Sequence, residues 1–234
     1  MSAPWVTYRP EIKVLDCTIR DGGLVNDHMF DDGLVKAVYE TCIESGIDYM
    51  EVGYKASKKL FAPSKFGAWK YCDEEDMRRI VGENESPLKL AAMTDAEKTD
   101  YHTDVLPRDQ SVLDLIRVAT YVKDMDKAID LAKRVKDLGY EVSCNIMAVS
   151  KENEFGLIEA LDQLAQTPVD VVVVDKKGRS MTLHKFAEDS YAILSREYMI
   201  VSLRMGYHFT TVEAMCTPEP SKNFIRMQYK HGGP

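Results

Sequence analysis

The chain has 234 residues, of which 45% are hydrophobic and 29% are charged, as in ordinary soluble globular proteins. Its formal net charge is −8 and its pI is near 5.2, which argues against a nucleic-acid or anionic-membrane partner, because phosphate groups are bound by basic surfaces. No apolar run has membrane-spanning length and the first residues lack a signal-peptide core, so the expected location is cytoplasmic. Five scattered cysteines without a CxxC pair indicate reduced thiols.

Strand-like and helix-like segments alternate from residue 12 to residue 175. The expected strands are the apolar runs 12–19, 49–54, 88–93, 115–122, 141–149 and 169–175. Helical spacing of apolar residues predicts a first helix that opens at Asp31 and Asp32 and stops at Gly46. Further helices are expected at 73–81, with Asp73 as N-cap, and at 124–138 and 151–166. Two long loops, 55–71 and 94–111, interrupt the pattern.

The expected strands are near-continuous apolar runs, which is typical of a parallel sheet covered on both faces. A TIM barrel and an open doubly wound sheet both fit this pattern. The first turn from strand to helix reads RDGG rather than G-x-G-x-x-G. The dinucleotide-binding fingerprint is therefore absent, and the barrel is favoured.

The alternation weakens after residue 175. A helix at 182–198 and a candidate seventh strand at 199–206 precede an irregular tail. A full (β/α)₈ barrel takes about 250 residues, and two long insertions already occupy part of this chain. We therefore predict an α/β fold, a TIM-type (β/α) barrel that is incomplete at its C-terminal end, with a lead-in at 1–11, the barrel at 12–215 and the tail at 216–234. Such a barrel would expose two unpaired strand edges.

The first expected strand runs into Arg20-Asp21-Gly22-Gly23. Residues at the C-terminal ends of barrel strands form the active site. The Asp21 carboxylate is a hard oxygen ligand that suits Mg²⁺ or Mn²⁺, and Arg20 could hold a carboxylate or stabilise an enolate oxygen. The alternative is a surface ion pair at a turn.

The segment from Asp16 to Gly22, DCTIRDG, matches a D-x-T-x-R-D-G motif. In this motif the chain resembles the hydroxymethylglutaryl-CoA lyase-like superfamily of metal-dependent aldolases and synthases, the DRE-TIM metallolyases with a pyruvate carboxyltransferase domain. The longer string LDCTIRDGGLVND is most similar to the branch of 4-hydroxy-2-oxovalerate aldolase. The resemblance covers roughly residues 12–175.

The resemblance implies a function and a set of roles. Asp21 would bind a divalent metal, Mn²⁺ or Mg²⁺. Arg20 would stabilise the enolate of a pyruvate-like or acetyl-like fragment, and Glu51 would order Arg20 and the metal shell. Glu51 also lies within the apolar run YMEVGY, where a charge needs a partner. The implied partners are a small 2-oxo acid or acyl-CoA substrate and further copies of the chain in a homo-oligomer.

Three more residues are candidates for the site. Asn145 lies inside an apolar run and either faces the barrel mouth, where it would bind substrate, or bonds to neighbouring strands. Asp175 ends the sixth run, where the resemblance implies substrate binding, but two lysines follow it in place of a hydroxyl residue. His208 could match the first histidine of the family's metal-binding H-x-H, whose second position is Thr210. Asp21 and His208 alone leave the metal shell short of ligands, so its occupancy is in doubt.

A histidine and a long loop are expected to have structural roles. His28 is expected to be a solvated loop histidine. The loop 55–71 carries five lysines and several aromatic residues. It could be a lid, a subunit contact or a patch for an anionic substrate such as an acyl-CoA or a phosphate, and a solvated loop is favoured.

Two functions remain open from the sequence. The first is an aldolase- or lyase-like enzyme that makes or cleaves a C–C bond beside a carbonyl. The second is a truncated or degenerate family member without catalysis, kept as a binding or assembly protein or not functional. The short length and Thr210 favour the second, and the complete RDG motif favours the first.

Overall fold

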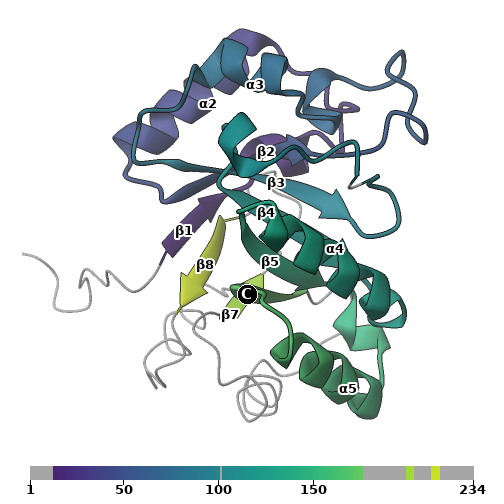
Figure 1. Cartoon of the computed structure of the whole chain (residues 1–234). Coiled ribbons are helices and arrows are strands. Elements are labelled where there is room, and N and C mark those ends of the chain that lie inside the picture. The colour runs from purple at the N-terminus through teal and green to yellow at the C-terminus, as the bar shows by residue number, and fades with distance from the viewer. Residues whose placement is uncertain (1–12, 101, 176–198, 203–211, 217–234) are drawn as a thin grey trace, which may run out of the picture.

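The computed structural model describes residues 13–100, 102–175, 199–202 and 212–216 (Figure 1). The strands are β1 Lys13–Asp16, β2 Tyr49–Tyr54, β3 Lys89–Asp95, β4 Leu115–Thr120, β5 Glu141–Ile146, β6 Val171–Asp175, β7 Met199–Ser202 and β8 Val212–Cys216. The α-helices are α1 Thr18–Gly22, α2 Asp32–Glu44, α3 Glu74–Val81, α4 Met125–Asp137 and α5 Glu154–Ala165. Short 3₁₀ turns are η1 Ala68–Lys70, η2 Arg108–Gln110, η3 Val122–Asp124 and η4 Val149–Lys151.

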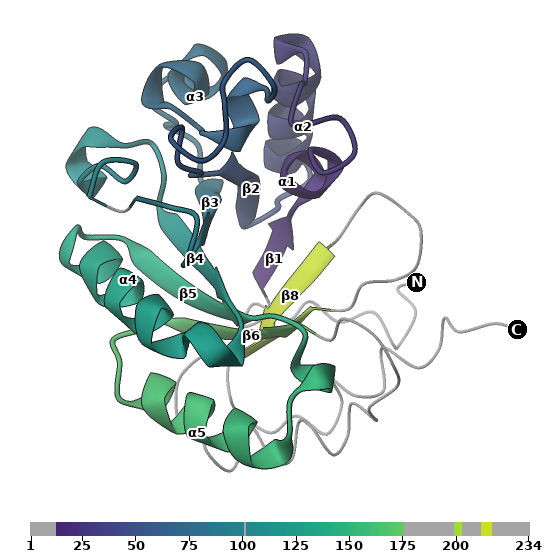
Figure 2. The same cartoon turned by 90° about the vertical axis from the view of Figure 1, so that its right-hand side faces the viewer.

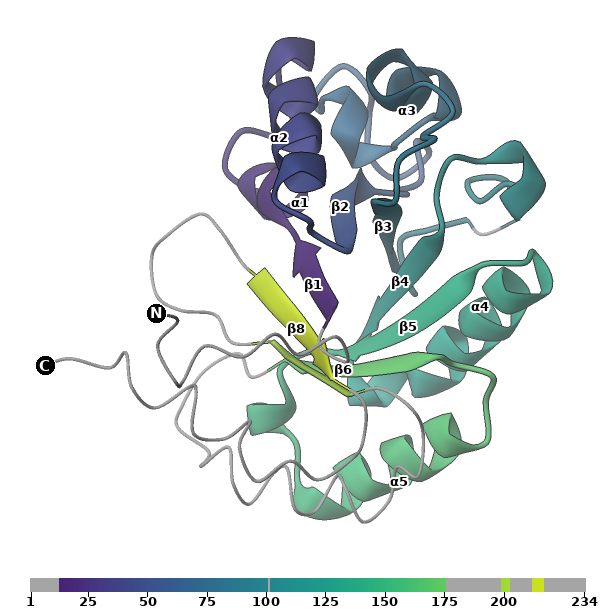
Figure 3. The same cartoon turned by 90° about the vertical axis from the view of Figure 1, so that its left-hand side faces the viewer.

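The first six strands form a curled parallel sheet in chain order. Figure 2 shows helices α2 to α5 along the outside of this curve. Strand β7 adds to β6 in parallel, and β8 pairs antiparallel with both β7 and β1, so that the strand order returns to its start (Figure 3). An α/β fold with a parallel half-barrel of six strands is therefore present, and the antiparallel β8 sets it apart from a complete TIM barrel. The edges that we expected to be open are paired through β8.

Alternate residues of each strand serve two separate cores. Met50, Ile116 and Val172 belong to the core that lies between the sheet and the helices. The intervening residues face the interior of the curve, where a second core contains Leu15, Cys17, Tyr49, Ala91, Leu115, Val171 and Val173. Because both faces are buried, the strands read as continuous apolar runs, as the sequence predicts.

The second expected strand is reproduced, with bounds Tyr49–Tyr54, but the first is shorter than expected. Strand β1 ends at Asp16, whose carboxylate accepts hydrogen bonds from the backbone N–H and the hydroxyl of Thr18 at 3.0 and 2.8 Å. These local bonds turn the chain, so Arg20 and Asp21 lie on the short helix α1 rather than on a strand. Asp73 precedes α3 without a side-chain capping bond, because its carboxylate pairs with Lys58 at 2.5 Å.

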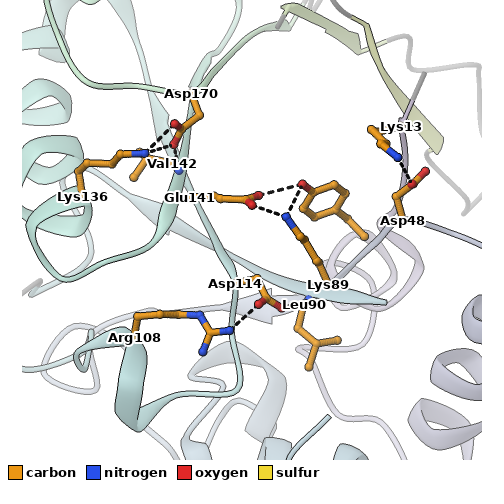
Figure 4. Close-up of polar contacts among 11 residues, drawn as sticks. Lys13, Asp48, Lys89, Leu90, Arg108, Asp114, Lys136, Glu141, Val142 and Asp170 are labelled. Atoms are coloured by element: carbon orange, nitrogen blue, oxygen red, sulfur yellow. Dashed lines mark hydrogen bonds and ion pairs between the residues drawn. The ribbon is translucent and has the colours of Figure 1, made fainter. Parts of the chain in front are cut away.

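Three aspartates make the same two contacts at the N-terminal end of the barrel (Figure 4). An aspartate directly before each of β2, β4 and β6 accepts a hydrogen bond from the second backbone N–H of the preceding strand, and each also pairs with a cation. The three sets are Asp48 with Val14 and Lys13, Asp114 with Leu90 and Arg108, and Asp170 with Val142 and Lys136. Backbone polar groups that the parallel ladder would leave unpaired are thereby satisfied.

A second interaction crosses the same end of the barrel. Glu141 of β5 accepts a hydrogen bond from the Tyr49 hydroxyl of β2 at 2.8 Å and forms an ion pair with Lys89 of β3. It therefore joins strands that are not neighbours in the sheet. Four cysteines, Cys17, Cys42, Cys72 and Cys144, are buried free thiols. Within the described ranges, no helix has the length and apolar character that crossing a bilayer requires.

Candidate functional site

Arg20 and Asp21 lie where β1 ends, and the structure brings Glu51 to them. Arg20 is only 7% exposed and Glu51 is fully buried. The Arg20 Nε donates to Glu51 Oε2 at 2.6 Å, and its Nη1 lies 2.5 Å from Asp21 Oδ1. Three residues that the sequence singled out for one site thus form one contiguous group at the C-terminal end of β1.

Arg117 of β4 is a member of this group that the sequence analysis missed. It is completely buried, and its Nη1 donates to Glu51 Oε2 at 2.8 Å and to Cys17 Sγ at 3.6 Å. A lone charge in the apolar run LIRVAT carries the same signal that singled out Glu51 in YMEVGY, because a buried charge needs a partner. The two charged residues occupy interior positions of β2 and β4, and each is the other's partner.

The electrostatics of the group fix the charge on Arg20. Burial is the largest single influence and lowers the pKa of Arg20, but the combined attraction of Glu51, Cys17, Tyr54 and Asp21 outweighs it and raises that pKa well above its ordinary value. Arg20 is therefore a permanent cation. The second carboxylate oxygen of Glu51, Oε1, is buried and has no hydrogen-bond partner among the described residues. It can accept a hydrogen bond from a bound molecule.

His28 also belongs to this region, and the expectation of a solvated histidine is wrong. The side chain is 2% exposed, and its ring packs edge-on against Tyr54, with ring centroids 5.3 Å apart. Burial, followed by repulsion from Lys70 and Arg20, lowers the pKa of His28 to about 4. The imidazole is therefore neutral at pH 7. Its buried Nδ1 has no hydrogen-bond partner within the part of the chain that the structure describes.

Two glycines allow His28 to be buried. A Cβ on Gly23 would lie 2.0 Å from His28 Nδ1, and a Cβ on Gly67 would lie 2.0 Å from the His28 carbonyl oxygen. Gly67 also donates its N–H to the Asp27 carbonyl at 2.9 Å. The loop 55–71, interpreted from the sequence as solvated, therefore packs against the His28 backbone. In the sequence, the Gly22-Gly23 pair is the one local sign of close packing near His28. It does not predict the burial of His28, because that burial also depends on the loop 55–71.

Tyr54 at the end of β2 joins this region to a cavity. Its ring contacts His28, and its phenol interacts with the Arg20 guanidinium. Burial raises the pKa of Tyr54, and Arg20 opposes that rise. The tyrosine is therefore protonated at neutral pH and can donate or accept a hydrogen bond beside Arg20.

The described side chains do not form a metal site by themselves. Among the described residues, no group of three or more His, Cys, Asp and Glu side chains is arranged to hold an ion. The Asp21 carboxylate is paired with Arg20, and the Asp16 carboxylate bonds to Thr18. His208, the other expected ligand, lies outside the described residues.

The two expected substrate-binding residues are placed less closely. Asn145 is buried on the interior side of β5, where its Oδ1 accepts a hydrogen bond from the Ser143 hydroxyl at 3.1 Å. Within the described part of the chain, no hydrogen bond joins Asn145 to Arg20 or Glu51. Asp175 is the last residue of β6, so its backbone lies at the same end of the sheet as Arg20.

Comparison with known proteins finds a likeness among solved structures. No protein-family model matches the chain, and no curated protein matches it. Among solved structures, it is similar to "the N-terminal domain of a putative aldolase from Bacteroides vulgatus", with a TM-score of 0.54 and 30% sequence identity. The match covers 68% of this chain and 52% of the other, so the chain spans about half the length of that structure. The likeness supports an aldolase-like β/α fold.

Proposed function

We propose that this protein is an aldolase-like enzyme that makes or cleaves a C–C bond beside the carbonyl of a 2-oxo acid, through an enolate. The observation that carries the proposal is the buried Arg20, which Glu51 and Asp21 hold at the C-terminal end of the strands. The RDG motif and the likeness to an aldolase domain support the same reaction class.

Arg20 would stabilise the enolate oxygen. A cation that two carboxylates already hold in one orientation needs little reorganisation when negative charge develops on the substrate. Arg117 would support this arrangement indirectly, because its 2.8 Å bond to Glu51 holds the carboxylate that orients Arg20. Arg117 is therefore a positioning residue in this proposal.

His28 is the candidate general base. It is neutral, and its Nδ1 has no hydrogen-bond partner among the described residues. Nδ1 would accept a proton from the hydroxyl of a 4-hydroxy-2-oxo acid during cleavage, once the Gly23 backbone that packs against this atom moves aside. A base with a pKa of about 4 is weak. A negatively charged substrate beside it would favour the protonated imidazole, and so would raise its pKa toward the working range.

A divalent metal is a separate part of the proposal, with Asp21 and His208 as its protein ligands. The described donors supply only a carboxylate that is already paired with an arginine. Arg20 would stabilise the enolate and His28 would accept the proton without taking part in metal binding.

The direct test is pyruvate release from 4-hydroxy-2-oxo acids by the full chain, with Mn²⁺ or Mg²⁺ added. We expect Arg20→Gln to lower kcat/KM by about 10²–10³, the usual effect of removing one oxyanion donor. Arg134→Gln is the matched control, because Arg134 is exposed on α4, and it should leave the rate unchanged. Absence of pyruvate release by the folded wild-type chain would favour the non-catalytic alternative.

A further inference from the structure

A cavity of about 230 Å³ opens at the C-terminal ends of β2 and β3. Its lining includes Tyr54, Phe61, Lys70, Asp95, Lys98 and Thr99. Tyr54 is also the residue that contacts His28, so the cavity adjoins the Arg20 region. It is smaller than the 300–1,000 Å³ range of pockets for drug-sized ligands. A small molecule fits such a volume, and a whole acyl-CoA does not.

Lys70 is held in this cavity by aromatic rings. Its Nζ lies 4.4 Å from the ring centroid of Phe61, 4.7 Å from that of Tyr54 and 5.6 Å from that of Phe66. Cation–π contacts of this kind orient an ammonium group and stabilise it without neutralising it. The positive charge therefore remains available to a ligand.

Among the residues that the structure describes, several lysines near Lys70 are paired with oxygen atoms, and Lys70 is not. Lys58 pairs with Asp73 at 2.5 Å, Lys59 pairs with Asp100 at 2.8 Å, and Lys98 pairs with Asp95 at 2.6 Å. Lys55 donates to the Cys72 carbonyl at 2.7 Å. No hydrogen bond or carboxylate contact to the Lys70 ammonium occurs among the described residues. Lys65, the remaining lysine of the loop, is exposed to water.

The charges around Lys70 favour an incoming anion. Asp95 is the carboxylate in the cavity lining, and it already neutralises Lys98. Burial and then the charge of Lys98 lower the pKa of Lys70, and the carboxylate of Asp95 only partly opposes them, as expected for a half-buried cation beside another cation. The attraction of an anion in the cavity would offset both the burial of the Lys70 ammonium and its repulsion by Lys98.

We propose that this cavity binds a small organic or inorganic anion, with Lys70 as the charged anchor and the rings of Tyr54 and Phe61 as the apolar wall. The chemistry is that of a carboxylate or a phosphate group. Binding does not require turnover, so this inference stands independently of the proposed function. If both hold, the bound anion lies beside Arg20 and His28.

The test is equilibrium binding to the full chain in EDTA, followed by calorimetry and by the thermal midpoint, with pyruvate and inorganic phosphate as probes. Methyl pyruvate is the uncharged control. We expect pyruvate or phosphate to bind and methyl pyruvate to bind at least about tenfold more weakly, since a charge-assisted contact is worth about 1.5–3 kcal/mol. The stronger of the two anions identifies the ligand class.

Substitutions of two lysines on the same loop test whether the anion binds at Lys70. Lys70→Met keeps the apolar stem and should lose about tenfold or more in affinity, whereas Lys70→Arg should retain binding. Lys59→Met, on the same loop but exposed and paired with Asp100, should bind as the wild type does. Unchanged affinity in Lys70→Met, or an equal loss of affinity in Lys59→Met, would overturn the proposal.

A measurement on the wild type covers the case in which Lys70→Met does not fold. Labelling of lysines by trinitrobenzenesulfonate, read by peptide mass spectrometry, reports on Lys70 directly. A saturating anion should slow labelling of Lys70 by about threefold or more, as expected for a mostly occupied site, and should leave the exposed Lys65 unchanged. Equal labelling of Lys70 with and without pyruvate or phosphate would refute the proposal.

Discussion

The two ends of the barrel differ in whether their buried polar groups have hydrogen-bond partners. At the N-terminal end, Asp48, Asp114 and Asp170 each bond to a backbone N–H and to a cation. At the C-terminal end, Glu51 Oε1 and His28 Nδ1 are buried without a hydrogen-bond partner among the described residues. A polar group with a hydrogen-bond partner adds to stability. A buried polar group without one lowers stability, but it can bind a ligand. The polar groups at the N-terminal end therefore stabilise the fold, and those at the C-terminal end form the candidate site.

The largest effect is expected where the C-terminal end holds its charges. Glu51→Gln leaves Arg20 and Arg117 facing a neutral amide, and we expect it to lower the free energy of unfolding by about 3–5 kcal/mol, as when a buried ion pair loses one partner. Urea denaturation measures the change. The control is Glu44→Gln on the exposed surface of α2, and a similar small effect from both substitutions would contradict the assigned ion pairs.

At the opposite end, Asp114→Ala should destabilise without altering function. It removes the acceptor of the Leu90 N–H and the partner of Arg108, at a cost of about 1–3 kcal/mol. Pyruvate release and anion binding, measured well below the unfolding temperature, should match the wild type. Asp162→Asn on exposed α5 is the control, and a selective loss of anion binding in Asp114→Ala would remove the distinction between the two ends.

The pH dependence of stability reports on His28. Its native pKa is about 4 against an ordinary 6.5, so the unfolded chain takes up a proton between these values and the native chain does not. Stability therefore falls as the pH falls from about 6.5 toward 4, by about 2 kcal/mol at pH 5 relative to pH 7. His28→Gln should lack this component in urea denaturation at both pH values. Equal pH slopes in the two proteins would show that His28 titrates normally.

The smallest effect is expected from divalent metal. For a site with two protein ligands and a dissociation constant on the order of 1 mM, 10 mM Mn²⁺ stabilises the native state by about 1.4 kcal/mol. Thermal unfolding should show a small rise in the midpoint, and Asp21→Asn should remove it. A rise that persists in Asp21→Asn would place the metal elsewhere on the chain.

Local patterns predicted much of the fold. The run YMEVGY gave the bounds of β2, and apolar runs covered on both faces gave the parallel sheet. The turn after Asp16 was missed because it depends on two side-chain bonds to Thr18, which a strand pattern does not reveal. The antiparallel β8 was missed for a different reason, since its pairing with β1 joins segments about 200 residues apart.

The candidate site was predicted only in part. Arg20, Asp21 and Glu51 could be grouped because each follows from a motif or from a charge in an apolar run. Arg117 carried the same signal and could have been found. The burial of His28 could not, because it depends on a loop about 40 residues later that packs on its backbone through Gly67.

The three aspartates at the N-terminal end also divide the barrel into strand pairs, β1–β2, β3–β4 and β5–β6. Their bonds to backbone amides span 34, 24 and 28 residues. Because loop-closure entropy rises only with the logarithm of loop length, the three closures cost nearly the same, and none of the three bonds uses a residue of another pair. The half-barrel is therefore built from three strand pairs that are fastened in the same way. Native-state hydrogen exchange at the amides of Val14, Leu90 and Val142 would report the opening of each unit separately.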